Sequence, residues 1–541
     1  MHPATSFKVQ RFIMVAVAPI VMALIMVFAA PHVARAEVTA FKQAVAEAAA
    51  RDEVLSEFYR AADYQGIWTS DSDADRNRRQ ALMQAINGAT AHGLAVERYA
   101  PDALMAQMKA ARTPRDLGKV EVAMSRTFLR LARDMQTGML TPSKIDSDLV
   151  RDVPLREPTS YLVNFAKSDP RGFFRSLPPK SAEYARLMKE KTRLELQMSA
   201  GGWGATVPAN TLAPGATGNA VVALRNRLTA MGFLKRSATN EYDTPLQQAV
   251  QQFQAAHGLV ADGTAGASTI KEINKGPEDR LAMIMVAMER ERWMNMPLGK
   301  RHIKVNLADF TTRIYDEGQV TFQTRAVVGK NTSDRRSPEF SDEMDHMEIN
   351  PVWNVPRSIA VGEYLPQMQR NRNAAGHLKL YNARGQQVSR ANINFGAYNA
   401  RTFPFNLKQP PSNSNALGLV KFMFPNRYNI YLHDTPAKNL FSREVRAYSH
   451  GCIRLADPFD FAYALLAKQE ADPKTFFHTI LDSKRQTRVN LDKKVPVHIM
   501  YRTAFTSAKG HTQYRPDIYG RDGRIWAALR AAGVSLPAQQ G

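Results

Sequence analysis

The sequence predicts a multidomain protein of the α+β class, and three observations support this. Its 541 residues exceed the usual length of one domain, and 44% apolar residues suffice for two or three cores. Helical periods dominate residues 37–205 and recur in a compact unit at about residues 213–275. Alternating strand patterns begin near residue 298 and continue to 502. We therefore expect a helical scaffold, a small helical unit and a β-rich domain.

The N-terminus has the pattern of an export signal. Lys8 and Arg11 precede an apolar run at residues 12–30, and residues 34–36 read Ala-Arg-Ala. A basic start, an apolar run and small residues are typical of a secretory signal peptide, here cleaved after Ala36. The apolar run is also long enough to span a bilayer, so an uncleaved N-terminal anchor stays open.

The chain is strongly basic, with a net charge of +22. Nucleic acid is the usual partner of such a protein, but the basic residues are spread along the chain and the N-terminus predicts export. We therefore expect no nucleic acid. A carboxylate-bearing cell-wall polymer or an anionic lipid surface fits the charge better.

Residues 37–205 are predicted to form the helical scaffold. The apolar residues of one segment repeat at spacings of three and four and stop before a glycine: Val120, Met124, Phe128, Leu131, Met135 and Gly138. An aromatic phrase at residues 58–68 suggests no chemistry and is predicted to be core.

A glycine- and proline-rich linker at residues 201–215 precedes the compact unit. Three apolar stripes predict three helices: Val221, Leu224, Leu228 and Met231; Leu246, Val250 and Phe253; Ile270 and Ile273. Thr244 is predicted to cap the second helix, with Pro245 at its first position.

The β-rich domain is predicted to open with a hairpin around the turn at residues 316–319 and to close with an alternating strand at residues 495–501. A long stretch rich in Asn, Arg, Gln and Gly, at about residues 354–425, interrupts it; stretches this long are functional or disordered. Residues 503–541 form a C-terminal tail with no readable period, and we assign it no role.

The chain's only cysteine, Cys452, lies in the run Ser449-His450-Gly451-Cys452-Ile453-Arg454. A reactive thiol needs a nearby base or backbone N–H groups, and a preceding glycine lets a carbonyl approach. A second imidazole, His433, follows the alternating residues 428–432, which predicts a strand ending at the histidine. The alternative is a buried structural thiol.

Several phrases of the chain resemble known families. The run 449–454, with His433-Asp434-Thr435, Asn415-Ala416-Leu417-Gly418 and Asn350-Pro351-Val352-Trp353, resembles the active-site region of L,D-transpeptidases with a YkuD-type catalytic domain. The family pattern places about fifteen residues between the histidine and Ser/Thr-His-Gly-Cys, and residues 434–448 match that gap. Residues 224–266 resemble peptidoglycan-binding domain 1, and residues 58–68 and 92–94 resemble the scaffold of large Gram-negative L,D-transpeptidases.

The resemblance implies a mechanism. Cys452 would attack the carbonyl between the third and fourth residues of a peptidoglycan stem, expel D-alanine and form a thioester that an amine resolves, giving 3→3 cross-links. His433 would be the base, oriented by a backbone carbonyl near Asp434, and the N–H groups of Gly451 and Cys452 would hold the oxyanion.

His450, Ser449 and Arg454 are expected to bind substrate or order the loop, and a role of His450 as the base stays open. In larger family members an insertion like residues 354–425 caps the site. We expect no cofactor and no metal, because one cysteine and two histidines lack a fourth ligand at a familiar spacing.

Three functions remain open from the sequence. The first is a transpeptidase of cell-wall biogenesis and remodelling, acting on stem peptides and glycan strands in the periplasm or cell envelope. The second uses another acceptor, either water, as in a carboxypeptidase, or an amine of an envelope protein. The third is a non-catalytic wall-binding protein that uses the helical unit alone. Membrane contact is expected only if the N-terminal segment stays uncleaved.

Overall fold

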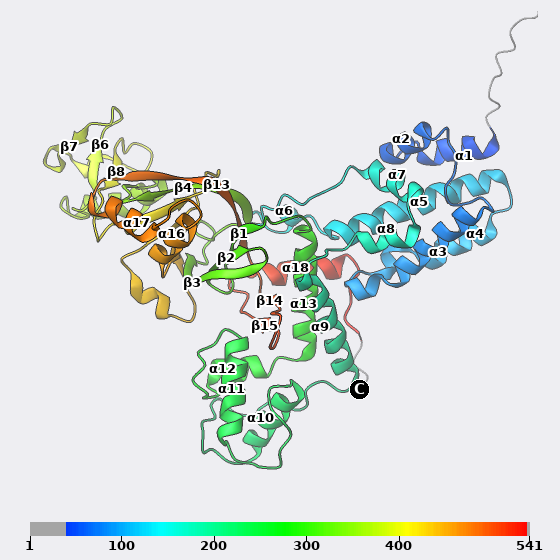
Figure 1. Cartoon of the computed structure of the whole chain (residues 1–541), viewed down its shortest axis with the longest axis horizontal. Coiled ribbons are helices and arrows are strands. Elements are labelled where there is room, and N and C mark those ends of the chain that lie inside the picture. The colour runs from blue at the N-terminus through cyan, green and yellow to red at the C-terminus, as the bar shows by residue number, and fades with distance from the viewer. Residues whose placement is uncertain (1–38, 538–541) are drawn as a thin grey trace, which may run out of the picture.

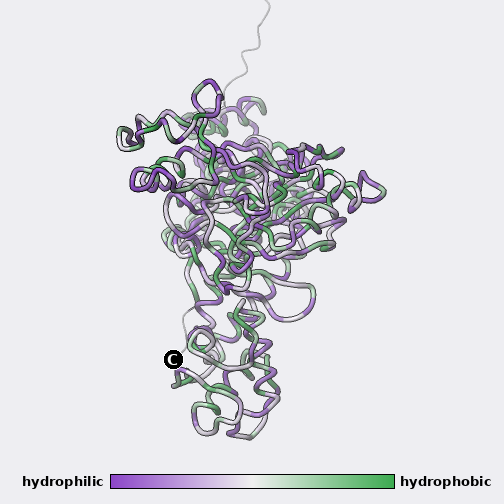
Figure 2. Tube along the Cα trace, turned by 90° about the vertical axis from the view of Figure 1, so that its left-hand side faces the viewer, coloured by the Kyte–Doolittle hydropathy of each residue, from purple (hydrophilic) through white to green (hydrophobic). Residues whose placement is uncertain are grey.

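The computed structural model describes residues 39–537, which form three lobes around one central helix (Figure 1). A helical lobe, a β-rich lobe and a small three-helix lobe meet there, and Figure 2 shows the small lobe projecting from the rest. The predicted multidomain α+β class is therefore confirmed.

The predicted export segment, residues 1–36, lies outside the described residues. Within the described range, no helix combines the length and the apolar character needed to cross a membrane.

The helical lobe contains α1 (Ala40–Ala49), α2 (Glu53–Ala61), α3 (Asp73–Asn87), η1 (Ala89–His92), η2 (Val96–Tyr99), α4 (Pro101–Ala110), α5 (Pro114–Thr137), α6 (Pro142–Ile145), α7 (Pro158–Lys167), α8 (Pro170–Ser176) and α9 (Ala182–Ser199). The predicted apolar stripe lies on α5 and is buried. Thr113 and Asp116 form a capping box at its start. The helix ends at Gly138, whose φ of 91° suits glycine, as predicted.

A buried carboxylate organises the aromatic phrase of this lobe. Glu121 is fully buried in α5, and it accepts hydrogen bonds from the backbone N–H groups of Ile67, Trp68 and Thr69. Tyr59 donates its hydroxyl to the same carboxylate at 3.0 Å. Tyr59 and Trp68 are themselves buried, so the prediction that this phrase is core is confirmed.

The small lobe consists of α10 (Asn219–Ala230), α11 (Thr244–Ala256) and α12 (Ala267–Ile273), and its three predicted stripes are buried. The predicted cap of the second helix was wrong by one residue. Asp243, not Thr244, is the cap, and its carboxylate accepts the N–H of Leu246 at 3.0 Å. Thr244 is already the first helical residue, which places Pro245 within the first turn.

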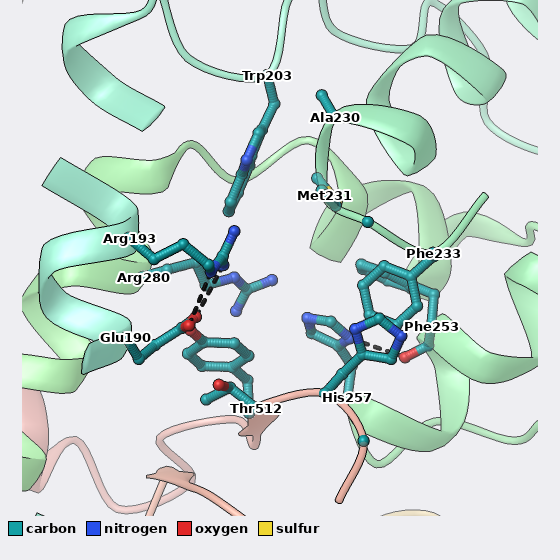
Figure 3. Close-up of a pocket in the computed structure, with 14 residues that line it drawn as sticks. Glu190, Arg193, Trp203, Ala230, Met231, Phe233, Phe253, His257, Arg280 and Thr512 are labelled. Carbon is teal, nitrogen blue, oxygen red and sulfur yellow. Dashed lines mark hydrogen bonds and ion pairs between the residues drawn. The ribbon is translucent and has the colours of Figure 1, made fainter. Parts of the chain in front are cut away.

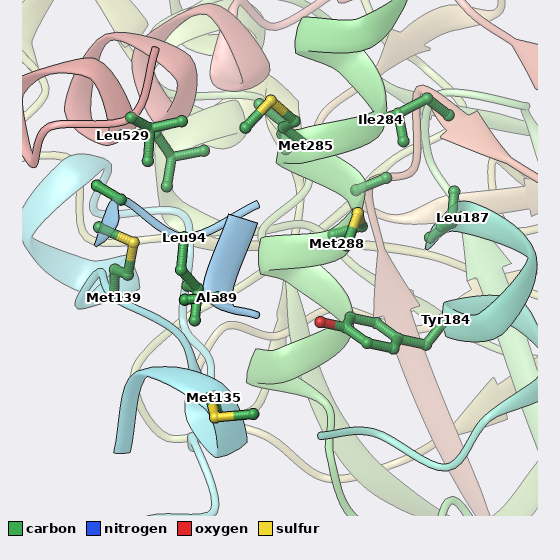
Figure 4. Packing of buried hydrophobic residues seen from close by; sticks show 14 of the residues in the cluster. Ala89, Leu94, Met135, Met139, Tyr184, Leu187, Ile284, Met285, Met288 and Leu529 are labelled. Atoms are coloured by element: carbon green, nitrogen blue, oxygen red, sulfur yellow. The ribbon is translucent and has the colours of Figure 1, made fainter. Parts of the chain in front are cut away.

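The central helix is α13 (Pro277–Trp293), and it packs against α9, α5 and the C-terminal helix α18 (Arg521–Ala531). Figure 4 shows Met285 and Met288 of α13 between Leu529 of α18 on one side and Leu187 of α9 on the other. All four side chains are buried. Because it is packed on several sides, α13 joins the lobes.

A nine-stranded sheet forms the β-rich lobe, in the order β11-β3-β12-β10-β9-β4-β13-β1-β2. Because β2 also pairs with β3, the sheet closes on itself. The strands are β1 (Arg301–Asn306), β2 (Thr311–Asp316), β3 (Gln319–Gly329), β4 (Phe340–Ile349), β9 (Val420–Met423), β10 (Leu432–His433), β11 (Ala447–Ser449), β12 (Ile453–Leu455) and β13 (Thr487–Met500). Three helices accompany them: η6 (Lys438–Ser442), α16 (Pro458–Leu466) and α17 (Pro473–Asp482).

The long polar stretch folds into a small subdomain of the β-rich lobe, with a sheet and an apolar cluster of its own. It contains a four-stranded sheet in the order β5-β8-β6-β7 and an apolar cluster that includes Trp353, Leu380 and Phe403. Its elements are β5 (Trp353–Asn354), α14 (Arg357–Ile359), the π-helical turn η3 (Ala360–Tyr364), α15 (Leu365–Arg370), β6 (Lys379–Tyr381), β7 (Gln387–Val388), η4 (Arg390–Asn392), η5 (Phe395–Ala397) and β8 (Asn406–Gln409). Strand β9 lies within the expected limits 354–425 but belongs to the large sheet, so the insert ends before Val420.

The segment named a tail in the sequence analysis is folded in its described part. It forms the hairpin of β14 (Ala504–Phe505) and β15 (Gln513–Tyr514), followed by α18. Arg515 joins this segment to two lobes, because it donates to the carboxylate of Asp309 at 2.6 Å and to the carbonyl oxygen of Ala256 at 2.9 Å.

One buried carboxylate holds the junction of the lobes. Glu339 is 1% exposed at the start of β4, and three arginines from other parts of the chain surround it. Arg290 of α13 lies at 2.8 Å, Arg521 of α18 at 3.3 Å and Arg151 of the segment before α7 at 3.7 Å. Burial opposes ionisation of Glu339, but the three positive charges hold its pKa below the usual value.

We predict that Glu339→Gln lowers the free energy of unfolding by about 3–5 kcal/mol, because it leaves buried arginines without their counter-charge. Denaturant unfolding of the full chain measures this. The control Glu317→Gln removes an exposed partner of Lys300 and is expected to cost less than about 0.5 kcal/mol. Because the folded-state pKa is lowered, the difference should be complete above about pH 5 and shrink as the pH falls further. Equal losses in the two variants would contradict the role of Glu339.

Candidate active site

Cys452 lies in the tight connection between β11 and β12. Its side chain is half-buried, and its thiol donates to the carbonyl oxygen of Asn429 at 3.5 Å. The thiol is therefore neither sealed in the core nor free in solvent.

Parallel pairing of β10 with β12 places His433 beside the strand that directly follows Cys452. In this register Leu432 is opposite Ile453, and His433 is opposite Arg454. Leu432 and Ile453 are fully buried in the core of the large sheet, so His433 and Arg454 lie on the other face. Tyr431 links the two residues, because it is hydrogen-bonded to the Cys452 thiol and its ring centroid lies 5.6 Å from that of His433.

The imidazole of His433 has a fixed tautomer. Its Nδ1 is hydrogen-bonded to the backbone carbonyl oxygen of Asp434, as predicted. A carbonyl oxygen can only accept, so Nδ1 carries the hydrogen and Nε2 keeps its lone pair. His433 is therefore oriented as a base.

The Cys452 thiol and the His433 imidazole are both neutral at rest. Burial lowers the pKa of His433 to about 3, and the charge of Arg454 lowers it further. Burial also raises the pKa of Cys452 to about 11, although Tyr431 and the charges of Arg454 and Lys421 act in the opposite direction. The pair therefore consists of a thiol and a neutral imidazole at pH 7.

Two serines fix the loop around Cys452. Ser449 Oγ donates to the carbonyl oxygen of Cys452 and accepts the N–H of Gly451 at 3.1 Å. Ser337 Oγ donates to the carbonyl oxygen of Gly451 at 2.6 Å. Ser449 thus orders the loop, and no residue in the range 39–537 accepts the N–H of Cys452. Of the two N–H groups expected to hold an oxyanion, that of Cys452 is the one available.

Glycine at position 451 follows from this geometry. Its φ is +113°, a conformation that favours glycine, and a Cβ would lie 3.2 Å from Cδ1 of Ile430. A side chain here would therefore disturb the backbone beside the thiol.

Asp434 fixes the neighbouring wall of the site. While its carbonyl oxygen holds His433, its carboxylate accepts the N–H of Leu419 at 2.9 Å. Gly418 has a φ of +62°, and a Cβ there would collide with the Asp434 side chain. The motif residues around positions 415–419 thus serve to orient the histidine.

His450 faces the insert rather than the sheet face of His433. Its Nε2 lies 2.6 Å from Oε1 of Glu363, which is in the π-helical turn η3. Arg335 donates to the same oxygen at 2.7 Å. This contact joins the cysteine loop to the insert.

Arg454 carries a buried positive charge beside the thiol. Its Nε has no hydrogen-bond partner among residues 39–537, and burial lowers its pKa while the Cys452 thiolate would raise it. The N–H at Nε is therefore a donor that can bond to an acceptor on a ligand.

Sequence reasoning missed several residues of the site. Ser337 and Glu363 lie in stretches with no recognised motif, and only their position in the fold brings them to the loop. The predicted strand at 428–433 was too long, because β10 contains only its last two residues. The side chain of Asn426 accepts the N–H groups of Tyr428 and Ile430. These residues therefore form a loop closed by a side chain instead of the first part of the predicted strand.

Within residues 39–537, no group of three or more His, Cys, Asp or Glu side chains gathers as metal ligands would.

Comparison with known families adds to this geometry. Residues 300–499 match the family YkuD, described as the L,D-transpeptidase catalytic domain. Residues 53–190 match the family described as Scaffold domain, and residues 217–273 match one described as "Putative peptidoglycan binding domain". These three matches agree with the domain architecture expected from the sequence. Cys452 and His433 both lie within the residues that match the catalytic-domain family.

A curated relative agrees with this architecture. The chain is 32% identical over 242 residues to a Haemophilus influenzae protein named "Putative L,D-transpeptidase". The alignment covers 44% of this chain and 48% of the relative, so the chain spans about half the length of the relative that it matches.

Two solved structures are also similar. An L,D-transpeptidase from Xylanimonas cellulosilytica, residues 123–326, is 15% identical with a TM-score of 0.16, covering 55% of this chain and 98% of that one. The Ldtfm–avibactam carbamoyl enzyme is 12% identical with a TM-score of 0.19, covering 40% and 61%. Both scores are too low to relate whole chains.

We predict that iodoacetamide alkylates Cys452 about tenfold faster for each pH unit between about pH 7 and 10, because only the thiolate reacts and its pKa is raised. Intact-mass kinetics measure the rate, with Cys452→Ala as the blank. A plateau near pH 7 would reveal a resting thiolate–imidazolium pair and contradict the neutral state.

Proposed function

We propose that this protein is an L,D-transpeptidase that forms 3→3 peptidoglycan cross-links through a thioester on Cys452. The observation that supports the proposal is an oriented imidazole, His433, on the strand paired with β12, which directly follows the half-buried thiol of Cys452. This pair lies inside the matched catalytic domain.

The first step is acyl transfer to the enzyme. Sγ of Cys452 attacks the carbonyl carbon between the third and fourth stem residues while Nε2 of His433 takes the thiol proton. The C–N bond then breaks, and His433 returns the proton to the departing amine of D-alanine. A thioester remains, and the imidazole is neutral again.

The backbone stabilises the charge that develops in this step. The N–H of Cys452 has no acceptor in the described part of the chain, so it can donate to the oxyanion. Gly451 contributes its positive-φ backbone conformation rather than its N–H, because that N–H already donates to Ser449 Oγ. Arg454 is placed to meet a stem carboxylate through its unpartnered Nε.

The second step transfers the acyl group to an acceptor. An amine of a neighbouring stem attacks the thioester, His433 takes its proton, and the Cys452 thiol is restored. Water in the same place would make the enzyme a carboxypeptidase, and an amine of an envelope protein would attach that protein to the wall. The insert, held to the cysteine loop through Glu363 and His450, is proposed to cap the site and favour amine over water.

The other domains fit action at the cell wall. We propose that the three-helix lobe binds peptidoglycan, as its family description suggests, and holds the catalytic domain on the polymer. The proposed place of action is the cell envelope, reached through the export signal predicted at residues 1–36.

We predict that Cys452→Ala abolishes acylation by a carbapenem and formation of 3→3 cross-links, since it removes the nucleophile. His433→Ala should lower kcat about 10²–10⁴-fold, the usual contribution of a general base. His450→Ala should lower it less, because His450 is bonded to Glu363 instead. Intact-mass acylation and muropeptide analysis measure these effects. If His450→Ala were the more damaging change, the base would be misassigned.

We predict that Glu363→Gln raises the ratio of hydrolysis to transfer severalfold, because the neutral amide weakens the contacts to His450 and Arg335 that hold the insert over the loop. Carbapenem acylation of Cys452 should persist. Glu343→Gln, which removes an exposed partner of Lys494, is the matched control. An unchanged ratio in Glu363→Gln would show that this contact does not restrict water.

A further inference from the structure

A cavity of about 320 Å³ lies where the small lobe meets α9, α13 and the β14–β15 hairpin. It shares no lining residue with the candidate active site. Figure 3 shows its side chains converging from these separate elements: Trp203 after α9, Arg280 of α13, His257 at the end of α11 and Phe233 after α10. Its volume is at the lower end of the range for small-ligand sites.

One wall of the cavity presents hydrogen-bond donors without strong acceptors. The indole N–H of Trp203 has no partner in the part of the chain described, although this side chain is only 6% exposed. Arg280 is 2% exposed. Its Nη2 donates to the carbonyl and carboxylate oxygens of Glu272, at 2.9 Å and 3.0 Å, whereas its Nη1 reaches only the weakly accepting sulfur of Met283, at 3.8 Å. Buried donors of this kind are normally satisfied, so the cavity is suited to a ligand that brings acceptors.

The opposite wall is built of flat rings. Phe233 stacks on His511 with ring centroids 3.8 Å apart, and Phe253 stacks on His257 at 3.7 Å. His257 Nδ1 is hydrogen-bonded to the carbonyl oxygen of Phe253 at 2.7 Å, which fixes its ring. Such rings offer a face for the C–H groups of a pyranose or another flat apolar surface.

Arg280 keeps one donor for an anionic ligand. Glu190 is engaged twice by Arg193, with both nitrogen–oxygen distances at 2.8 Å, and once by the hydroxyl of Tyr514 at 3.1 Å. The Arg280 guanidinium lies over the Tyr514 ring at 4.7 Å, and its Nη2 pairs with the carboxylate of Glu272 at 3.0 Å. Because Glu272 engages only Nη2, the Nη1 group remains the donor that a ligand carboxylate can meet.

We propose that this cavity binds an acidic N-acylated amino sugar of a glycan strand. Its carboxylate would accept from Arg280, its acyl carbonyl from Trp203, and its ring face would stack on the aromatic wall. The choice of a cell-wall glycan as the source rests on the proposed function. The C-terminal hairpin, through His511 and Tyr514, is thereby part of the ligand site.

The cavity lies next to a residue that joins the small lobe to the catalytic domain. Arg515 bonds the small lobe at Ala256 and the catalytic domain at Asp309. A glycan held between these lobes therefore lies at a set place relative to the sheet that carries Cys452.

The test titrates the full-length protein with three probes, by calorimetry: the disaccharide of N-acetylglucosamine and N-acetylmuramic acid, chitobiose, which lacks the carboxylate, and a free stem tetrapeptide, which lacks the sugar. We expect the muramyl disaccharide to bind most tightly. Trp203→Phe should weaken it about fivefold, as for one lost hydrogen bond, and Arg280→Lys about tenfold. Trp526→Phe, a change of the same kind outside this cavity, should bind as the parent does.

Each result decides the proposal. No binding of the muramyl disaccharide, equal binding by Trp203→Phe and Arg280→Lys, or tighter binding of the tetrapeptide would overturn it. Thermal unfolding of each variant shows whether Arg280→Lys is folded, and Trp203→Phe keeps the test valid if it is not. Carbapenem acylation of the same samples separates the two hypotheses: acylation without sugar binding overturns only this site, and sugar binding without acylation overturns only the transpeptidase.

Discussion

The arrangement of this protein depends on a single buried carboxylate and the arginines around it. Glu339 begins a strand of the large sheet, yet its partners Arg290, Arg521 and Arg151 come from three other parts of the chain. Charges this deeply buried are tolerated only when they are paired. The lobes are therefore held at one relative position, since displacement of any of them would leave a charge without its partner.

The same principle operates on a smaller scale at Cys452. Ser449 and Ser337 bond the backbone of Gly451 and the carbonyl oxygen of Cys452, and Asp434 holds both His433 and the chain beside it. The N–H of Cys452 has no acceptor within residues 39–537. A polar group left unpaired within such a well-bonded loop is a feature expected where a ligand completes the bonding.

The sequence was sufficient for features that depend on local pattern. The stripe on α5 and the three helices of the small lobe follow from spacing, and these helices were confirmed. Features that depend on distant partners were not predictable. The insert packs around Trp353 despite its polar composition, and the C-terminal hairpin shows no period because its two-residue strands are too short to establish one. The sequence around Glu363 did not indicate its role, because its partners His450 and Arg335 lie in other segments of the chain.

The neutral states of the Cys452 thiol and the His433 imidazole bear directly on the proposed reaction. With pKa values of about 11 and about 3, proton transfer from Cys452 to His433 is unfavourable in the resting protein. The thiolate is also the form that oxidants and stray electrophiles attack, so the resting thiol is protected. Transfer becomes favourable only when the new charge is stabilised elsewhere, as on an oxyanion at the Cys452 N–H. Reactivity is thus coupled to the presence of a correctly placed carbonyl, and Arg454, which opposes charge on the imidazole but favours it on the sulfur, strengthens that coupling.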